Sequence, residues 1–255
     1  MRNRLRLVFF LATLLLAGPT AVHAQAQKAP RTPDVIYVPT PQEVVEDMLR
    51  LVNVKKGDVL YDLGSGDGRI PITAAKLYGV RAVGIDIDPQ RIAEAQENAK
   101  KAGVTHLVEF RQADLFMSDF REATVITLYL LPELNVKLRP KILNLKPGTR
   151  IVSNSFTMGD WKEDERADLT ADAGCSSSSW CTALLWIVPA RVAGTHKLPQ
   201  GEVTLKQTYQ MLSGTLSTEG KNYALEGKVR GEDVTFKAGG REYRGRMNGK
   251  SLELR

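Results

Sequence analysis

Apolar residues follow two spacings between residues 42 and 156. A repeat of three or four residues predicts helices, and short runs rich in β-branched residues predict strands. The strands are expected at 59–62, 81–87, 107–110, 125–131 and 150–156, and helices at 41–52, 70–78, 89–102 and 134–145. Thr40 is expected to cap the first helix, with Pro41 in its first turn. Pro140 must kink or split the last one. Strands that alternate with helices indicate a mostly parallel sheet covered on both faces.

The pattern changes after Phe156. Residues 159–174 are polar and acidic, with a short strand expected near 167–170, and an apolar strand is expected at 184–188. From residue 195 onward, short alternating strands are separated by turns, and Asn248-Gly249 is a strong hairpin signal. The sequence therefore predicts an α/β domain over 34–189 followed by a small antiparallel β unit over 195–255.

The N-terminus has the three parts of a secretory signal peptide. Arg2, Arg4 and Arg6 precede an apolar run from Leu7 to Ala17, and small residues end at Ala24. We expect cleavage after Ala24, which makes 1–24 a signal peptide and 25–33 a flexible leader. The alternative is an uncleaved anchor, but the run is shorter than the roughly 20 residues that span a bilayer. The sequence predicts an exported protein, periplasmic or secreted, with no transmembrane span after processing.

Composition narrows the function only modestly. The net charge is +6 over 255 residues, and acids are interspersed throughout, so the charge by itself does not favour a nucleic-acid partner. Cys175 and Cys181 are either a disulfide, as an oxidising compartment allows, or two free thiols. No metal site is expected, because only His106 and His196 remain after processing and no Cys/His cluster has zinc spacing.

Three glycines alternate directly after the first predicted strand, in Gly64-Ser65-Gly66-Asp67-Gly68. Glycine reaches positive φ cheaply and lets a ligand approach the backbone, and the helix that follows offers free N–H groups. The dinucleotide fingerprint requires a small residue three positions after the second glycine. Arg69 stands there, so a nicotinamide-dependent oxidoreductase is disfavoured.

Acids stand at the ends of three successive predicted strands, namely Asp62, Asp86 and Asp114. Ligands of such sheets bind at the carboxyl ends of the strands, beside the switch point. A lone acid there is commonly structural, and Asp114 could cap a turn. Three acids in register with a glycine turn instead indicate a site for a nucleotide-type cofactor.

In combination, "DLGSGDGR", "GIDIDP" and "ADLF" resemble the motifs of class I S-adenosylmethionine-dependent methyltransferases. The resemblance covers about residues 37–188. It implies a Rossmann-like sheet and S-adenosylmethionine as cofactor. The implied contacts are a glycine turn at the methionyl end with Asp62, a carboxylate for the ribose, and residues around the adenine. These cofactor-binding residues would be Asp62, Gly64, Gly66, Asp86, Ile87, Asp114 and Leu115.

A closer similarity is to the protein-lysine methyltransferases that include the enzyme acting on the c subunit of ATP synthase. It is carried by "YVPTP", the helix after it and "DLGSGDGR", and "GTRIVSNSF" is more distantly similar to histone-lysine methyltransferases. This similarity implies that Tyr37 to Thr40 fold over the cofactor. It also implies that Tyr129, Glu133 and Asn154 border the pocket for the methyl acceptor.

The acceptor itself stays open between a protein lysine and a small molecule. Nucleic acid is disfavoured, because Tyr129-Leu130-Leu131-Pro132 replaces the Asn/Asp-Pro-Pro-aromatic motif of enzymes that methylate exocyclic amines. S-adenosylmethionine is made inside cells, so an exported enzyme needs a supply. The alternative is a non-catalytic envelope protein that uses the fold to bind a ligand or a partner.

Overall fold

The structure is a computed structural model that describes residues 32–168, 182–199 and 201–254. Its first sheet has the strand order β3-β2-β1-β4-β5-β7-β6. Five strands run parallel: β1 (Val59–Leu63), β2 (Arg81–Asp86), β3 (Val108–Gln112), β4 (Val125–Leu128) and β5 (Arg150–Asn154). The antiparallel strands β6 (Glu165–Asp168) and β7 (Thr182–Ile187) complete one side. The switch point lies between β1 and β4, where the chain reverses its direction across the sheet.

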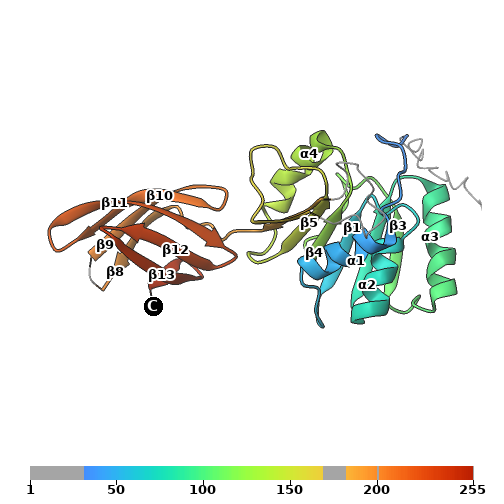
Figure 1. The fold of residues 1–255 in the computed structure, drawn as a ribbon, viewed down its shortest axis with the longest axis horizontal. Coiled ribbons are helices and arrows are strands. Elements are labelled where there is room, and N and C mark those ends of the chain that lie inside the picture. The colour runs from blue at the N-terminus through green and yellow to red at the C-terminus, as the bar shows by residue number, and fades with distance from the viewer. Residues whose placement is uncertain (1–31, 169–181, 200, 255) are drawn as a thin grey trace, which may run out of the picture. The chain divides into compact units, whose positions relative to one another are not determined.

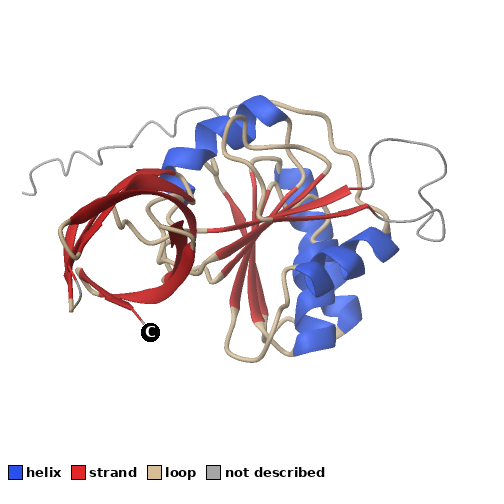
Figure 2. Ribbon diagram, turned by 60° about the vertical axis from the view of Figure 1, so that its left-hand side comes forward, coloured by secondary structure: helices blue, strands red, loops and turns tan. Residues whose placement is uncertain are grey.

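Helices cover both faces of this sheet, as the sequence predicts (Figures 1 and 2). One face packs against α1 (Gln42–Leu51) and α2 (Arg69–Tyr78), with α3 (Pro89–Ala102) beside α2. The other face packs against α4 (Pro132–Ile142) and the loops around it. Successive residues of a strand point to opposite faces. In β1, Leu60 therefore packs toward α1 and α2, while Tyr61 and Leu63 pack toward α4.

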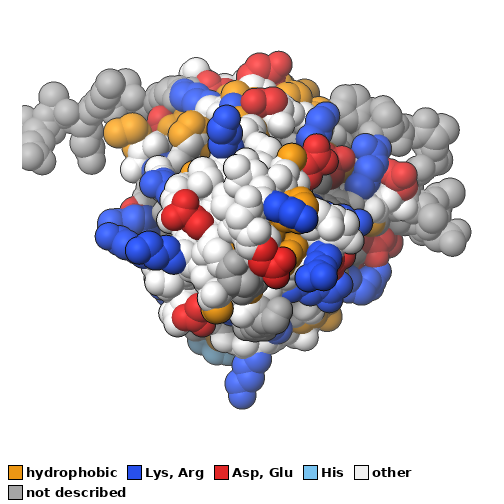
Figure 3. All heavy atoms as spheres, turned by 90° about the vertical axis from the view of Figure 1, so that its left-hand side faces the viewer, with side chains coloured by type: hydrophobic (Ala, Val, Ile, Leu, Met, Phe, Trp, Pro, Cys, Tyr) orange, Lys and Arg blue, Asp and Glu red, His pale blue; other side chains and the backbone are white. Residues whose placement is uncertain are grey.

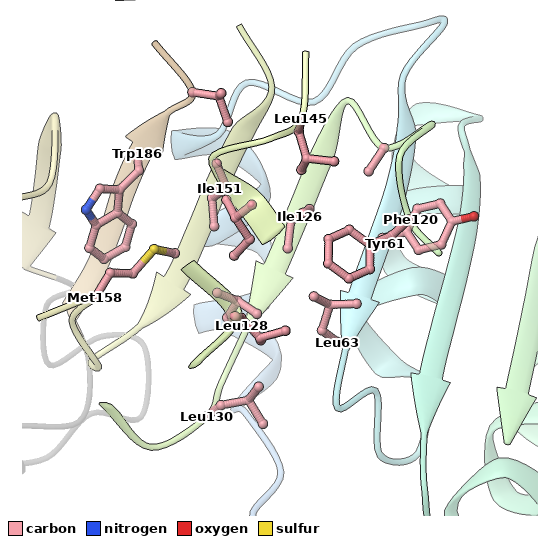
Figure 4. Close-up of a cluster of buried hydrophobic side chains, with 14 of the residues drawn as sticks. Tyr61, Leu63, Phe120, Ile126, Leu128, Leu130, Leu145, Ile151, Met158 and Trp186 are labelled. Atoms are coloured by element: carbon pink, nitrogen blue, oxygen red, sulfur yellow. The ribbon is translucent and has the colours of Figure 1, made fainter. Parts of the chain in front are cut away.

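The core on the α4 side is built from large side chains of the central strands and of the loops that cover them (Figure 4). Trp161 and Trp186 are fully buried in it, and the indole of Trp186 donates to the backbone oxygen of Trp161 at 2.9 Å. A buried indole N–H needs such an acceptor. This core holds the carboxyl ends of β4 and β5 in place.

The second sheet is an antiparallel meander in the order β14-β13-β12-β11-β10-β9-β8. Its strands are β8 (Gly194–Leu198), β9 (Gly201–Thr208), β10 (Met211–Thr218), β11 (Lys221–Arg230), β12 (Asp233–Ala238), β13 (Arg241–Asn248) and β14 (Ser251–Leu254). The first and last strands lie beside each other, so the sheet curls into a barrel, which Figure 2 shows as a ring. We call this part the C-terminal barrel. This contact between β8 and β14 makes the two edge strands less open to the pairing that invites aggregation.

Apolar side chains fill the barrel and paired charges cover it. The interior includes Val203, Leu225, Phe236 and Met247, all nearly inaccessible. Outside, arginines of β13 pair with nearby acids; Arg246, for example, lies 2.6 Å from Glu232. Lys and Arg side chains are interspersed with Asp and Glu on the face in Figure 3. The exterior thus carries both signs rather than one basic surface.

Several predicted boundaries are wrong by a few residues, for local reasons. The first helix begins after Pro41, and no side chain caps it; Thr40 is buried, and its carbonyl accepts from Arg69 at 2.7 Å. Helix α4 passes through Pro140 without a break. Strand β5 ends at Asn154, because Ser155 adopts a left-handed backbone with φ of 62°.

The turn between β9 and β10 contains Tyr209, which has a φ of 52°. Met211, at the start of β10, is more than half exposed.

Some predictions fall outside the described residues. The signal peptide and most of the leader lie before residue 32, and Cys175 and Cys181 lie between β6 and β7 in residues 169–181. Among the described residues, no helix has both the length and the apolar character that crossing a membrane requires.

Candidate functional site

A cavity of about 510 Å³ opens at the carboxyl ends of β1, β2 and β4. Its walls come from the glycine turn after β1, the end of β2, the turn after β3, the end of β4 and the segment before α1. This volume lies in the range of small-molecule sites. Nearly all predicted cofactor residues line it, namely Tyr37, Thr40, Asp62, Gly64, Gly66, Asp86, Ile87 and Leu115.

The glycine turn needs its glycines. Gly64, Gly66 and Gly68 all have positive φ. A Cβ on Gly66 would come within 2.4 Å of the Tyr37 ring, and one on Gly64 would come within 2.9 Å of Leu130. The turn is therefore both conformationally and sterically specific to glycine.

Asp86 holds this turn from the end of β2. Its Oδ2 accepts from the Gly66 backbone N–H at 2.8 Å, and its Oδ1 accepts from the Asp88 N–H at 2.9 Å. These two bonds fix the orientation of the carboxylate, and each oxygen keeps a further lone pair. A carboxylate held in this way can accept from a pair of ribose hydroxyls.

Asp62 is a buried acid at the end of β1. Its side chain is fully enclosed, and Oδ1 accepts from the Thr127 hydroxyl at 2.7 Å. Burial raises the pKa of Asp62 to about 8, although the hydrogen bond from Thr127 acts in the opposite direction. Without a nearby cation the protonated form is favoured. A cationic ligand group beside Asp62 would favour the carboxylate.

The segment before α1 lies over the glycine turn as a strap, defined here as residues 34–40. Arg69 donates through Nη1 to the Thr40 carbonyl at 2.7 Å and pairs with Asp67 at 2.8 Å. Arg91 is on α3, and its guanidinium lies 4.7 Å from the centroid of the Tyr37 ring. The prediction that Tyr37 to Thr40 cover the cofactor site agrees with this placement.

The residues present fit S-adenosylmethionine. The turn offers close backbone approach, Asp86 offers acceptors for ribose hydroxyls, and Ile87 and Leu115 offer apolar surface for adenine. Asp62 offers a negative charge for the methionyl ammonium.

The other predicted site residues are distributed unevenly. Tyr129 lines the cavity, and burial raises the pKa of its phenol. Asp114 does not line it; its Oδ1 accepts from the Phe116 N–H at 2.8 Å, which caps the turn after β3. Glu133 is exposed near the start of α4, and Asn154 is buried beside Ser155, which donates to it at 2.9 Å. Neither Glu133 nor Asn154 lines the cavity.

The sequence did not reveal three residues that build this site. Arg69 was noted only because it breaks the dinucleotide fingerprint, yet it anchors the strap. Arg91, which lies on α3 and 22 positions after Arg69, stacks on Tyr37. Thr127 holds Asp62 from the neighbouring strand. Their roles could not be inferred from local motifs, because each acts across a distance that only the fold closes.

Comparison with known proteins identifies relatives of this site. The family described as the ANTKMT methyltransferase domain matches residues 62–165, which include the end of β1 and all of β2 to β5 and exclude the C-terminal barrel. A protein-lysine N-methyltransferase of Saccharolobus islandicus is 48% identical over 135 residues, which are 52% of this chain and 84% of the relative. A lysine N-methyltransferase of Mus musculus, named for the c subunit of ATP synthase, is 33% identical, over 50% of this chain and 51% of the mouse enzyme.

A solved structure gives the same picture. It is described as an RNA methyltransferase from Salinibacter ruber in complex with S-adenosyl-L-homocysteine. It is 52% identical to this chain with a TM-score of 0.56, and the match covers 61% of this chain and 96% of that one. S-adenosyl-L-homocysteine, which S-adenosylmethionine becomes after it gives up its methyl group, therefore binds a protein similar to this chain.

Proposed function

This chain belongs to the class I S-adenosylmethionine-dependent methyltransferases, and we propose that its methyl acceptor is the side-chain amine of a protein lysine. One observation carries the proposal: the similarity to the archaeal protein-lysine N-methyltransferase spans 84% of that relative. The cavity supports it, because the cofactor side and Tyr129 lie in one continuous space.

The bound cofactor supplies a methyl group on a sulfonium, which an amine can attack in line. The chain mainly aligns the two reactants. Asp86 and the glycine turn would hold the adenosyl part, Asp62 would balance the charge of the methionyl ammonium, and Tyr129 would border the entrance for the acceptor. A lysine amine, with an ordinary pKa near 10.4, must lose a proton before it attacks.

Apolar walls favour that deprotonation. Leu130 and Leu134 line the cavity beside Tyr129, and desolvation lowers the pKa of an amine. Either Glu133, which is exposed near the start of α4, or a water chain would receive that proton. Full turnover in Glu133→Gln would remove it from the mechanism. Asn154 likewise stays a predicted border of the acceptor pocket.

The experiment is a transfer assay on residues 25–255 with methyl-labelled S-adenosylmethionine. Lysine-rich protein is the acceptor, and the same protein with its lysines blocked by acetylation is the control. Methyl-lysine in the hydrolysate of the unblocked sample alone is the expected result. An RNA arm is included because the Salinibacter ruber relative is described as an RNA methyltransferase. Transfer to RNA and not to lysine would overturn the proposal.

We also propose that the protein is exported and acts in the envelope. The basic start, the apolar run from Leu7 to Ala17 and the small residues before Ala24 support this. Mass spectrometry of the chain from the envelope fraction should find an N-terminus at Gln25. An intact chain in the cytoplasmic fraction would contradict it. A chain that is exported and binds cofactor, yet methylates nothing, would favour the non-catalytic alternative.

A further inference from the structure

Two aromatic rings meet on the acceptor side of the cavity. Tyr129 follows β4 and lines the cavity, and Phe156 follows β5. Their ring centroids are 5.8 Å apart and their planes differ by 22°. We infer that Phe156 is a positioning residue for methyl transfer, which holds the Tyr129 ring where the acceptor amine enters. This inference rests on the proposed function.

The backbone after β5 is shaped to place Phe156. Ser155 has a φ of 62°, a conformation that costs free energy in a residue other than glycine. Its N–H donates to Thr182 on β7 at 2.6 Å, and the Phe156 N–H donates back to the Asn154 carbonyl at 2.7 Å. The strand thus ends in a tight reversal, and the next side chain stacks on Tyr129.

A buried amide on α4 fixes this reversal. Asn135 is fully inaccessible, and its Nδ2 donates to the carbonyls of Phe156 and Thr157 at 3.3 and 3.2 Å. A polar side chain is costly to bury unless it forms such bonds. A leucine would fill this core position on α4, so the amide is explained by the two carbonyls that it holds.

The stacking geometry shows how Phe156 acts. The ring separation is that of an ordinary aromatic pair in direct contact, so no alkyl chain fits between the two rings. An acceptor must therefore pass along another side of Tyr129. Phe156 acts on transfer through Tyr129, by restricting the torsions of that side chain. Small misplacements of a positioning group reduce rates strongly.

Single variants measure the size of this effect. With a lysine-rich peptide as acceptor, Phe156→Ala should lower kcat/KM at least about tenfold. The dissociation constant for S-adenosylhomocysteine should not change, because Phe156 does not line the cavity. Phe156→Tyr should restore activity, since it keeps the ring. Thr157→Ala is the matched control on the next, exposed residue and should behave like the wild type.

A double-mutant cycle separates positioning from a general structural role. In a Tyr129→Ala background, Phe156→Ala should cost less than about twofold, because its target is already gone. Asn135→Leu, which is similar in size but has no donor, should reproduce the loss seen in Phe156→Ala. Fully additive losses for Tyr129 and Phe156 would overturn the inference.

A second readout needs no acceptor. Burial raises the pKa of Tyr129, so Phe156→Ala should bring that pKa back toward the ordinary value of a tyrosine. Absorbance titration identifies this phenol by the difference between wild type and Tyr129→Phe, each made with and without Phe156→Ala. An unchanged Tyr129 titration would overturn the inference. A wild-type enzyme that transfers no methyl to lysine would instead refute the proposed function, and the titration would still decide the role of Phe156.

Discussion

The two sheets of this chain have seven strands each in the described residues, but the space at the ends of their strands differs. The mostly parallel sheet brings the carboxyl ends of β1, β2 and β4 to one edge, where Asp62 and Asp86 line a cavity. The C-terminal barrel closes on itself, fills its interior with apolar side chains and pairs charges outside. A switch point leaves space between diverging connections, whereas a closed meander leaves none. The candidate active site therefore lies at the first sheet.

The sharpest test of this division is Asp86→Ala. The variant removes the carboxylate that holds the glycine turn and is predicted to accept from the ribose. The two charge-assisted hydrogen bonds predicted from the ribose hydroxyls would be lost. We expect the free energy of S-adenosylhomocysteine binding to weaken by about 4 kcal/mol, which is roughly a thousandfold in the dissociation constant measured by calorimetry. Asp119→Ala, at an exposed acid away from the cavity, is the control. Equal affinity in Asp86→Ala and wild type would remove Asp86 from the site.

Phe236→Ala tests the other side of the comparison. Phe236 is buried in the C-terminal barrel and stacks on Tyr243, with centroids 5.0 Å apart. Truncation of such a ring should lower the free energy of unfolding by about 3 kcal/mol, as denaturant titration would measure. Below the unfolding transition, affinity for S-adenosylhomocysteine should stay at the wild-type value. Weaker cofactor binding in the folded variant would show that the barrel supports the site.

A pair of glycines sharpens the contrast further. Gly66 and Gly249 both have positive φ, but a Cβ on Gly66 would meet Tyr37 and one on Gly249 would meet nothing within 4 Å. Gly66→Ala should weaken cofactor binding by about 2 kcal/mol, because it combines backbone strain with displacement of the strap. Gly249→Ala should show only the backbone strain. We expect it to lower the free energy of unfolding by about 1 kcal/mol and to leave cofactor binding unchanged. Similar binding losses in both variants would contradict a site-specific role for Gly66.

The last prediction concerns pH. The folded protein holds the Asp62 proton up to a pKa of about 8, while an unfolded aspartate releases it near 3.9. Between these values the folded state binds more protons, so this group makes the free energy of unfolding fall by roughly 1.4 kcal/mol for each pH unit. Asp62→Asn lacks this titration, so its Tm relative to wild type should rise steadily from pH 5 to pH 8. A difference in Tm that does not change with pH would contradict the raised pKa of Asp62.

The sequence by itself determined the parallel sheet and its cofactor edge. Strand and helix periods gave the order of elements, and the glycines with Asp62 and Asp86 marked the strand ends, because the carboxyl ends of parallel strands must meet at one edge. The barrel was predicted only as an antiparallel unit. Its closure depends on β8 and β14 meeting across the whole unit, which no local pattern encodes.

Only the tertiary structure decided which residues support the site. Arg69 reaches the strap 29 residues earlier, and Asn135 reaches a loop 21 residues later. The end of β5 was set by Ser155, whose unusual backbone is held by bonds to other segments. Periodicity reports whether a residue faces a core. It does not report which distant partner satisfies a buried polar group, because that pairing is a product of the packed fold.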